Sequence, residues 1–340
     1  MRRALLYCAG GGIGDSLIAT VVAQALRTRY ESVDALTLPG HRSTLELVPE
    51  IESVFVDEDE PVDRHVAALR ERNYEACVVT WATPRAAAAV RGARIPVRVG
   101  QARRLYSRSF THRVVVRSER GDVTSHWSDI LLDYARAIGC DAAGARPRIV
   151  PREEDERSAR ALSAEFGLGN DGYIVLHPSN AVATQRGLWP TNGWARTARA
   201  LRERCGLPVL LSGADADRDI VARIVDESGD ARVLSIAGRL SIGAFAALSR
   251  DARAFIGITT GSMHVAAAAG ARTVGIFPFQ SDFPERWAPL CDRRAIVRSA
   301  FPCHAGDRKE TCADYACISG LDTPRILAAL EGLLGAAGPG

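Results

Sequence analysis

The sequence predicts an α/β protein of two Rossmann-like, doubly wound domains. Strand and helix signals alternate along the chain, which is typical of a parallel sheet covered by helices on both faces. The length of 340 residues exceeds what one hydrophobic core usually holds. The same alternation also starts again after a polar stretch that follows residue 144. Two sheets, one in each half, are therefore expected.

The first half opens with an apolar strand at residues 4–9, a glycine loop at 10–15 (GGGIGD), and a helix over 16–29 with apolar residues at helical spacing. Further strands are expected at 33–38, 53–56, 75–80 and 95–99, and helices at 61–72, 83–91 and 125–138. Residues 1–150 are predicted to form the first domain.

The glycine loop differs from a dinucleotide-binding fingerprint. Asp15 stands where the pattern G-x-G-x-x-G needs its third glycine. A carboxylate at a helix start repels phosphate, so the loop is not expected to hold one. Asp15 either caps its own helix, or points into space that the glycines leave for a substrate.

Arginine is concentrated between residues 85 and 120, where the only acidic residue is Glu119. This cluster is either a solvated face, or a surface for an anionic acceptor or for the inner leaflet of a membrane. Residues 103–108 (RRLYSR) form a loop that could fold over such a ligand. The arginines of the window are Arg85, Arg91, Arg94, Arg98, Arg103, Arg104, Arg108, Arg113, Arg117 and Arg120.

Residues 151–170 are predicted to be a linker with an outer helix, residues 171–320 a second domain, and residues 321–340 a final helix and tail. Within the second domain, residues 279–319 show few signals and are expected to be mostly loop. Strands are expected at 173–177, 208–211, 233–236 and 255–258, with another ending at 277, and helices at 191–204, 242–248, 263–269 and 323–334.

Three loops of this half, beginning near residues 178, 213 and 259, follow strands and are expected to line one cleft. The third opens a helix at residues 259–264 (TTGSMH), and a helix start offers free N–H groups to an anion such as a diphosphate. Capping by Thr259, Thr260 and Ser262 is the alternative. His264 would then be an ordinary structural histidine.

The composition is that of an ordinary globular protein, with a net charge of +3 that gives no reason to expect a nucleic-acid partner. No apolar run reaches the roughly 18 residues of a membrane span, and the apolar N-terminal stretch is too short for a secretion signal. We therefore expect a cytoplasmic location. Cys291, Cys303, Cys312 and Cys317 lack the spacing of a zinc ribbon, so free thiols are favoured over a metal site or disulfides.

Several motifs together resemble glycosyltransferase family 9, the ADP-heptose:lipopolysaccharide heptosyltransferases. These motifs are residues 12–15 (GIGD), 176–179 (LHPS), Trp189 with Pro190, 238–241 (GRLS), and 259–268 (TTGSMHVAAA). They occur in both halves, and the last is the most specific. The resemblance implies the GT-B fold, in which two Rossmann-like domains face each other across a cleft.

The resemblance also implies inverting transfer of a heptose from an ADP-sugar to an acceptor hydroxyl, with no required metal or other cofactor. Asp15 matches the catalytic aspartate of the family. Acceptor contacts are expected from Gly12, Gly14, Arg103, Arg104 and Arg108, which suit an anionic saccharide or glycolipid at the inner membrane face. The expected donor contacts are His177, Ser179, Asn180, Arg186, Gly213, Gly238, Thr259, Thr260, Gly261 and His264.

Two departures from the family pattern leave alternatives open. Many members have aspartate where this chain has Thr259, and a lysine where it has Gly187, although Arg186 could supply that charge. A different nucleotide-sugar donor, an acceptor other than lipopolysaccharide, or a non-catalytic nucleotide-sugar-binding protein therefore remain alternatives. An NAD-dependent oxidoreductase is disfavoured because neither glycine loop has the fingerprint spacing.

Overall fold

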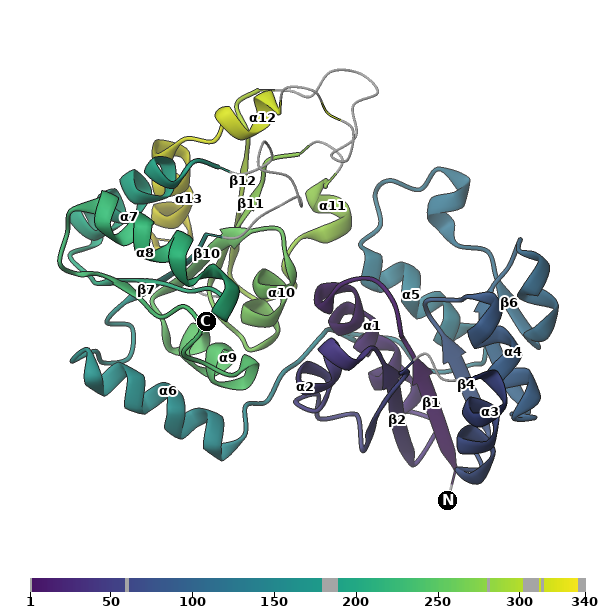
Figure 1. The fold of residues 1–340 in the computed structure, drawn as a ribbon. Helices are drawn as coiled ribbons and strands as arrows, with labels where there is room; N and C mark the ends of the chain where they lie inside the picture. The colour runs from purple at the N-terminus through teal and green to yellow at the C-terminus, as the bar shows by residue number, and fades with distance from the viewer. Residues whose placement is uncertain are drawn as a thin grey trace. The chain divides into compact units, whose positions relative to one another are not determined.

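The structure is a computed structural model that describes residues 2–58, 61–178, 189–279, 282–301, 312 and 315–335. Figure 1 shows its ribbon. Four residues named above, Ser179, Asn180, Arg186 and Gly187, lie outside the described residues, as does Cys303. The chain divides into two compact units, Met1–Val150 and Pro151–Gly340, and each is described by itself.

The first unit contains a six-stranded sheet in the order β3-β2-β1-β4-β5-β6. All of its neighbouring strands run parallel. The strands are β1 (Arg3–Tyr7), β2 (Ser32–Thr37), β3 (Val54–Val56), β4 (Ala76–Val79), β5 (Val97–Gln101) and β6 (His112–Val114).

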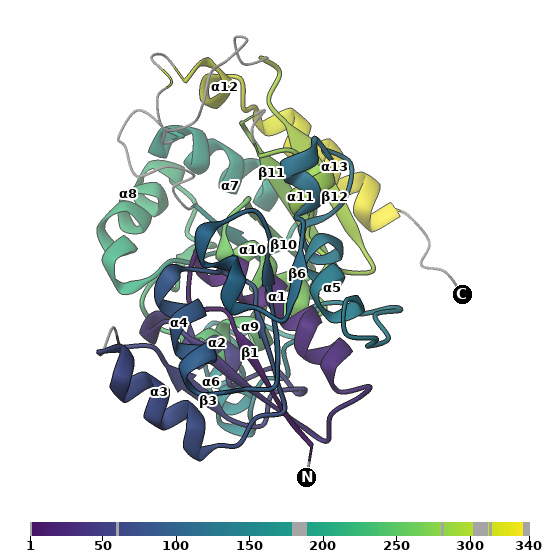
Figure 2. The same cartoon turned by 90° about the vertical axis from the view of Figure 1, so that its right-hand side faces the viewer.

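Helices cover both faces of this first sheet. Helices α3 and α4 pack together on one face, whereas α1, α2 and α5 lie on the other (Figures 1 and 2). Their bounds are α1 (Ile13–Leu26), α2 (Arg42–Leu45), α3 (Val62–Glu71), α4 (Pro84–Gly92) and α5 (Trp127–Arg136), with short 3-10 turns at Pro39–His41, Leu105–Ser109 and Arg117–Arg120.

The second unit repeats this topology, with a six-stranded parallel sheet in the order β12-β11-β10-β7-β8-β9. In each sheet the order reverses between the first and fourth strands of the unit, β1 and β4 in one and β7 and β10 in the other. The strands are β7 (Ile174–His177), β8 (Val209–Leu211), β9 (Val233–Ser235), β10 (Ala254–Ile258), β11 (Thr273–Phe277) and β12 (Arg294–Arg298).

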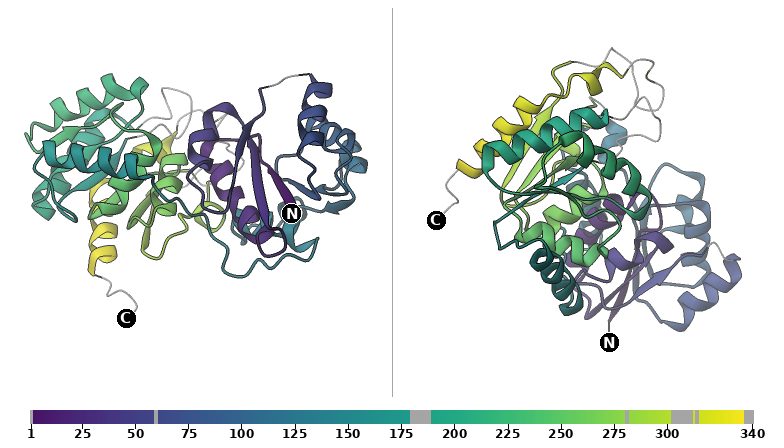
Figure 3. Two further views of the ribbon diagram at one scale, coloured as in Figure 1. Left: turned by 90° about the horizontal axis from the view of Figure 1, so that it is seen from below. Right: turned by 60° about the vertical axis from the view of Figure 1, so that its left-hand side comes forward.

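The helices of the second unit also form two layers. Helices α7, α8 and α13 pack together, whereas α9 and α10 lie on the other face and α6 runs along α9 (Figures 1 and 3). Their bounds are α6 (Glu153–Glu165), α7 (Thr191–Cys205), α8 (Arg218–Ser228), α9 (Ile242–Asp251), α10 (Gly261–Ala268), α11 (Pro284–Trp287), α12 (Ala316–Ser319) and α13 (Thr323–Gly335), with a 3-10 turn at Asp215–Asp217.

The predicted α/β class with two doubly wound sheets is confirmed, but the expectation for residues 279–319 is partly wrong. That stretch contains α11, α12 and the edge strand β12, which pairs with β11 through five residues from Arg294 to Arg298. Strand β6 was not predicted either. Both missed strands lie at sheet edges and carry arginines, so they lack the continuous apolar run of a central strand.

Small residues explain how closely the central helix of the second unit approaches its sheet. A Cβ on Gly275 of β11 would lie 2.9 Å from the sulfur of Met263 in α10. The residues of α10 from Met263 to Ala268 are all buried. Because only glycine leaves that space in β11, the start of α10 is held firmly at the carboxyl end of β10.

Candidate functional site

Asp15 lies at the switch point of the first sheet, in the first turn of α1, which a short glycine loop joins to β1. Its Oδ2 accepts a hydrogen bond from the Gly12 backbone N–H at 2.8 Å, so the capping role predicted as one alternative is present. No donor among the described residues contacts Oδ1. In open α/β sheets, ligands bind at the switch point, outside the carboxyl ends of the strands. The carboxylate is therefore placed both to cap and to meet a ligand.

The glycines before Asp15 leave less room for a substrate than we expected. A Cβ on Gly10 would lie 2.0 Å from the Trp81 side chain, so that space is filled by the indole ring. Gly11 has a φ of +68°, and a Cβ there would lie 2.7 Å from the Asp15 carboxylate. Gly14 is buried in α1, and Gly12 is exposed. Of the two glycines predicted to bind the acceptor, only Gly12 is at the surface.

A buried histidine lies close to Asp15. Ser16 donates a hydrogen bond to the Cys8 carbonyl at 3.2 Å, and its Oγ lies 2.8 Å from Nδ1 of His41. Burial lowers the pKa of His41, although the negative charge of Asp15 opposes this effect. A neutral imidazole therefore supports the helix start. Nothing in the sequence around His41 had singled it out.

Asp15 shares a narrow crevice with residues from other elements of the first unit. Thr80 and Trp81 follow β4, and Trp127 begins α5. Trp81 keeps 44% of its surface exposed, whereas Tyr7 and Cys8 at the end of β1 are buried. The switch point of this sheet thus combines one carboxylate with two indole rings. Sequence reasoning had identified only the carboxylate.

The arginine-rich window divides into paired and unpaired side chains. Arg104 pairs with Glu119 at 2.6 Å, and Arg117 pairs with Asp129 and Asp133 at 2.6 and 2.7 Å. Arg98 donates from Nε to the Ser109 carbonyl at 2.8 Å. Among the described residues, exposed arginines of this window without an ion pair are Arg91, Arg94, Arg103, Arg108, Arg113 and Arg120.

The predicted acceptor arginines surround an exposed leucine. Leu105 has 90% of its surface exposed, and it lies between Arg104 and Arg108 in the 3-10 turn Leu105–Ser109. The turn is tied to the rest of the unit because the hydroxyl of Tyr106 donates to the Ala82 carbonyl at 2.7 Å. Phe110 anchors its other end, filling the space where a Cβ on Gly100 would lie.

Arg85 is part of an internal network. It pairs with Asp57, which also accepts a hydrogen bond of 2.5 Å from the hydroxyl of buried Tyr7. Burial alone would raise the pKa of Asp57, but the hydrogen bonds from Arg85 and Tyr7 outweigh it and lower the pKa. Arg85 is therefore held by Asp57 in this structure.

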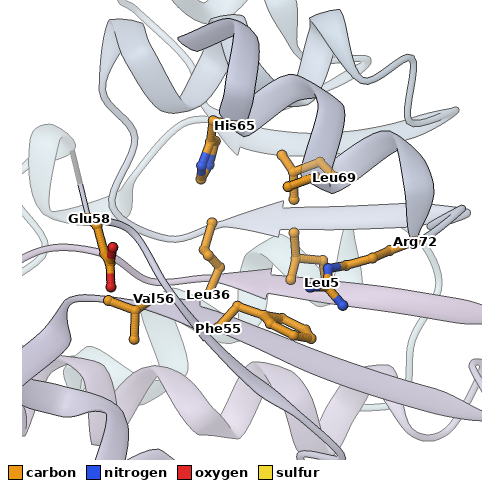
Figure 4. A pocket seen from close by; sticks show the side chains of 9 residues that line it. Leu5, Leu36, Phe55, Val56, Glu58, His65, Leu69 and Arg72 are labelled. Atoms are coloured by element: carbon orange, nitrogen blue, oxygen red, sulfur yellow. The ribbon is translucent and has the colours of Figure 1, made fainter. Parts of the chain in front are cut away.

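A separate cavity of about 190 Å³ lies between α3 and the sheet (Figure 4). His65 and Leu69 of α3 lie across it from Leu36 of β2, and Glu58 and Arg72 lie at its ends. The Arg72 guanidinium lies 3.4 Å from the centroid of the Phe55 ring. The cavity shares no lining residue with the Asp15 crevice, and no predicted site residue lines it.

In the second unit, the predicted anion seat lies at the switch point between β7 and β10. Thr260 is the N-cap of α10, but its side chain makes no capping hydrogen bond and instead donates to the Ile258 carbonyl at 3.2 Å. Thr259, Thr260, Gly261 and Ser262 are half-exposed, and His264 is 9% exposed. The first backbone N–H groups of α10 thus begin at a partly open surface, where the helix dipole favours an anion.

His177 ends β7 beside this helix start. Its Nδ1 lies 2.9 Å from the hydroxyl of Ser212, and its ring contacts those of Phe245 and Phe255. Burial lowers the pKa of His177 to about 4, so the imidazole is neutral near pH 7. A neutral histidine provides a hydrogen-bonding edge and no positive charge for a phosphate.

Gly213 and Gly238 lie together where β8 and β9 end. The Gly238 N–H donates to the Gly213 carbonyl at 2.9 Å, and Gly238 has a φ of +67°. Arg218 covers this junction, because its Nη2 donates to the Gly238 carbonyl at 2.9 Å and its Nε pairs with Asp215 at 2.5 Å. Arg218 is an exposed cation that sequence reasoning had missed.

No disulfide joins the described cysteines of the C-terminal region. Cys291 and Cys312 are half-buried and Cys317 is buried. Within the residues that the structure describes, no group of three His, Cys, Asp or Glu side chains could hold a metal ion. None of the described helices combines the length and apolar character needed to cross a bilayer.

The family model described as glycosyltransferase family 9 (heptosyltransferase) matches residues 62–316. This match covers well over half of the chain and includes the switch point of the second unit. The chain therefore belongs to glycosyltransferase family 9. No protein of curated function matches the sequence.

Solved structures of heptosyltransferases share the fold. Escherichia coli ADP-heptose lipopolysaccharide heptosyltransferase II is 19% identical, with a TM-score of 0.78 and 98% of each chain covered. A family 9 glycosyltransferase from Veillonella parvula is 17% identical, with a TM-score of 0.85 over 99% of this chain and 98% of that one. The E. coli heptosyltransferase WaaC, solved with ADP, is 16% identical, with a TM-score of 0.70 over 97% and 99%.

These likenesses confirm the GT-B type of architecture predicted for the chain. Together with the family match, they make the protein a glycosyltransferase.

Proposed function

We propose that this glycosyltransferase moves a heptose, or a related sugar, from an ADP-activated donor to a hydroxyl of a saccharide acceptor. The observation that carries the proposal is the placement of polar groups at both switch points. Asp15 follows β1 in one sheet, and residues 259–264 follow β10 in the other. The WaaC structures were solved with ADP and with an ADP-heptose analogue, which supports the choice of nucleotide.

The second unit would bind the donor. The N–H groups at the start of α10, from Gly261 onward, would receive the diphosphate, because the dipole of the helix favours negative charge there. Thr259 and His264 would contact the donor beside it, and His177, Gly213 and Gly238 would line the neighbouring strand ends. Ser179, Asn180 and Arg186 complete the proposed donor set from outside the described residues.

Asp15 would be the general base. As the acceptor oxygen attacks the anomeric carbon, its proton passes to the carboxylate, and the bond from that carbon to the diphosphate breaks on the opposite face. ADP leaves with the electron pair of that bond, so the configuration at the anomeric carbon inverts. The carboxylate can retain its bond to Gly12 N–H during this step, because Oδ1 is the oxygen left for the proton.

The exposed arginines next to Leu105 would bind the acceptor side. Arg103 and Arg108, together with Arg104, carry the positive charge that an anionic saccharide needs, and Leu105 would enter the surface of a membrane that holds a glycolipid acceptor. Co-sedimentation with phosphatidylglycerol vesicles should fall when Leu105 is changed to Ser, and should be absent with phosphatidylcholine vesicles. Equal binding to both vesicle types would remove the membrane part of the proposal.

A substitution at the N-cap of α10 tests the donor seat. Aspartate is a better N-cap than threonine, so Thr260→Asp should keep or raise the melting temperature while its charge repels the diphosphate. We expect calorimetry to show at least about tenfold weaker binding of ADP-heptose, since charge effects at a helix end reach 1–2 kcal/mol. The matched control is Thr83→Asp, at the N-cap of α4 in the first unit.

Unchanged ADP-heptose affinity in Thr260→Asp would place the diphosphate elsewhere. Calorimetry should also compare the affinities of the intact protein for ADP-, GDP-, UDP- and dTDP-sugars. A preference for a base other than adenine would select the alternative donor that Thr259 and Gly187 leave open. If the protein binds a donor but releases no ADP whichever acceptor is added, a non-catalytic binding protein would be favoured.

A further inference from the structure

The half-exposed Trp81 has no part in the function proposed so far. It follows β4 at the switch point of the first sheet, lines the same crevice as Asp15, and leaves 44% of its surface exposed. An exposed indole offers a large apolar face beside a polar N–H, which suits a ligand that has both apolar and polar groups. We propose that Trp81 is the platform on which the acceptor sugar stacks, so that one of its hydroxyls reaches Asp15. This inference rests on the assignment of Asp15 as the base.

The indole is held in position before any ligand arrives. Its five-membered ring packs on Gly10, where even a methyl group would lie 2.0 Å from the ring. The residue before it is fixed by the Thr80 N–H, which donates to the Tyr7 carbonyl at 3.0 Å. The residue after it is fixed by the hydrogen bond from Tyr106 to the Ala82 carbonyl. A rigid aromatic side chain loses little entropy when a ligand stacks on it.

The surroundings of Trp81 favour a sugar over a nucleotide. A pyranose ring has a face of C–H groups that packs on an indole, and hydroxyl groups at its edge that donate to a carboxylate such as Asp15. A nucleobase also stacks on aromatic rings. However, the carboxylate beside Trp81 repels the phosphates that a nucleotide carries. The chemistry of the site therefore points to the uncharged ring of the acceptor.

The acceptor would then be recognised by two adjoining surfaces with different chemistry. Tyr106 belongs to the turn that carries Leu105 and Arg108, and its hydroxyl is bound to the residue that follows Trp81. The turn can therefore hold anionic groups of the acceptor, while Trp81 holds the sugar ring that reacts. This division explains how one acceptor site can combine an uncharged reacting ring with a strongly basic border.

Saturation-transfer NMR on the full chain tests the platform without requiring turnover. The probes are methyl α-D-mannopyranoside, methyl β-D-glucopyranoside and a methyl heptopyranoside, with AMP as a separate arm. We expect saturation of the C–H protons on one ring face of at least one glycoside. The signal should fall at least about fivefold in Trp81→Ala and be largely retained in Trp81→Phe, because phenyl also offers an aromatic face.

The matched control is Val123→Ala, which removes another exposed apolar side chain of the same unit that does not line the crevice. It should keep the glycoside signal of the intact protein. An unchanged melting temperature would show that Trp81→Ala is folded. Binding of ADP within about threefold of the intact protein would show that the loss is confined to the glycoside site, because the proposed nucleotide site lies in the other unit.

The proposed platform is overturned if no glycoside receives saturation, or if the glycosides keep their saturation in Trp81→Ala. It is also overturned if Trp81→Ala loses the signal of AMP and not that of the glycosides. Failure of the glycosyl transfer itself gives a different result. In that case the intact protein would release no ADP from ADP-heptose with any acceptor, whatever the glycosides do at Trp81.

Discussion

His177 shows how a single buried side chain can couple folding to pH. Its pKa is lowered to about 4 in the folded protein, compared with about 6.5 in an unfolded chain. The unfolded state therefore binds a proton between these values that the folded state does not bind. The contribution of His177 to the free energy of unfolding is fully present above about pH 6.5. It is lost as the pH falls toward 4, and the total loss is about 3 kcal/mol.

Changing His177 to Asn should remove this dependence while leaving an amide to pair with Ser212. We expect the free energy of unfolding, measured by urea titration at several pH values, to be lower at pH 7 but flatter between pH 6.5 and 4. His112→Asn, at a half-exposed position of β6, should keep the slope of the intact protein. An equal slope in His177→Asn would show that other groups cause the acid sensitivity.

The limits of sequence reasoning are clearest for individual residues of the first switch point. The place of Asp15 in the first turn of a helix could be predicted because it follows a glycine loop and precedes a stretch of helical periodicity. Trp81 could not, because it follows the apolar strand 75–80 and reads as one more core residue. Its exposure depends on Gly10, which is 71 positions away in the chain and makes room for the indole. Contacts of that range are not encoded in local periodicity.

At the level of elements, the junction between α6 and α9 is held by unusually specific contacts. Asp155 is 7% exposed and accepts hydrogen bonds from the Arg152 N–H at 3.1 Å and the Ser241 hydroxyl at 2.6 Å. The carboxylate occupies the space left by Gly243 in α9. Arg250 adds two hydrogen bonds to Glu156, at 2.7 and 3.0 Å. The helix predicted to lie beside the linker is thus fastened to the second unit.

Two Gly→Ala substitutions should have opposite effects on stability. A Cβ at Gly243 would lie 2.1 Å from Asp155, which cannot turn away without losing both hydrogen bonds. We expect Gly243→Ala to destabilise by about 1–2 kcal/mol, as overpacking does. Gly332, in α13, has open space around it, so Gly332→Ala should stabilise by about 0.5–1 kcal/mol.

Thermal and urea unfolding of the two variants measure this difference. Stabilisation by both substitutions would mean that α6 moves freely relative to α9.

The fold itself was largely predictable at this scale, because central strands such as β1 and β10 are continuous apolar runs. The edge strands β6 and β12 were not, since both are partly exposed and arginine interrupts or flanks their short apolar runs.

At the scale of the whole molecule, the two units repeat one topology, and each has polar residues at its switch point. These residues follow the first strand of one unit, β1, and the fourth strand of the other, β10. Strand order could not be read from the sequence, because it depends on pairings between distant strands. Once the order is known, the switch point of each sheet is defined, and the polar groups after β1 and β10 lie there. The proposed division of labour, with a base in one unit and a diphosphate seat in the other, rests on these two positions.

The most direct test is the steady-state release of ADP from ADP-heptose by Asp15→Asn. Asparagine still accepts from Gly12 N–H, so the helix cap and donor binding should persist, with an ADP-heptose Kd within about threefold of that of the intact protein. Turnover should fall by about 10² or more, as for a lost general base. Asp322→Asn, which alters a capping carboxylate 2.8 Å from Arg325 N, should keep full turnover. Turnover by Asp15→Asn at the rate of the intact protein would contradict the account.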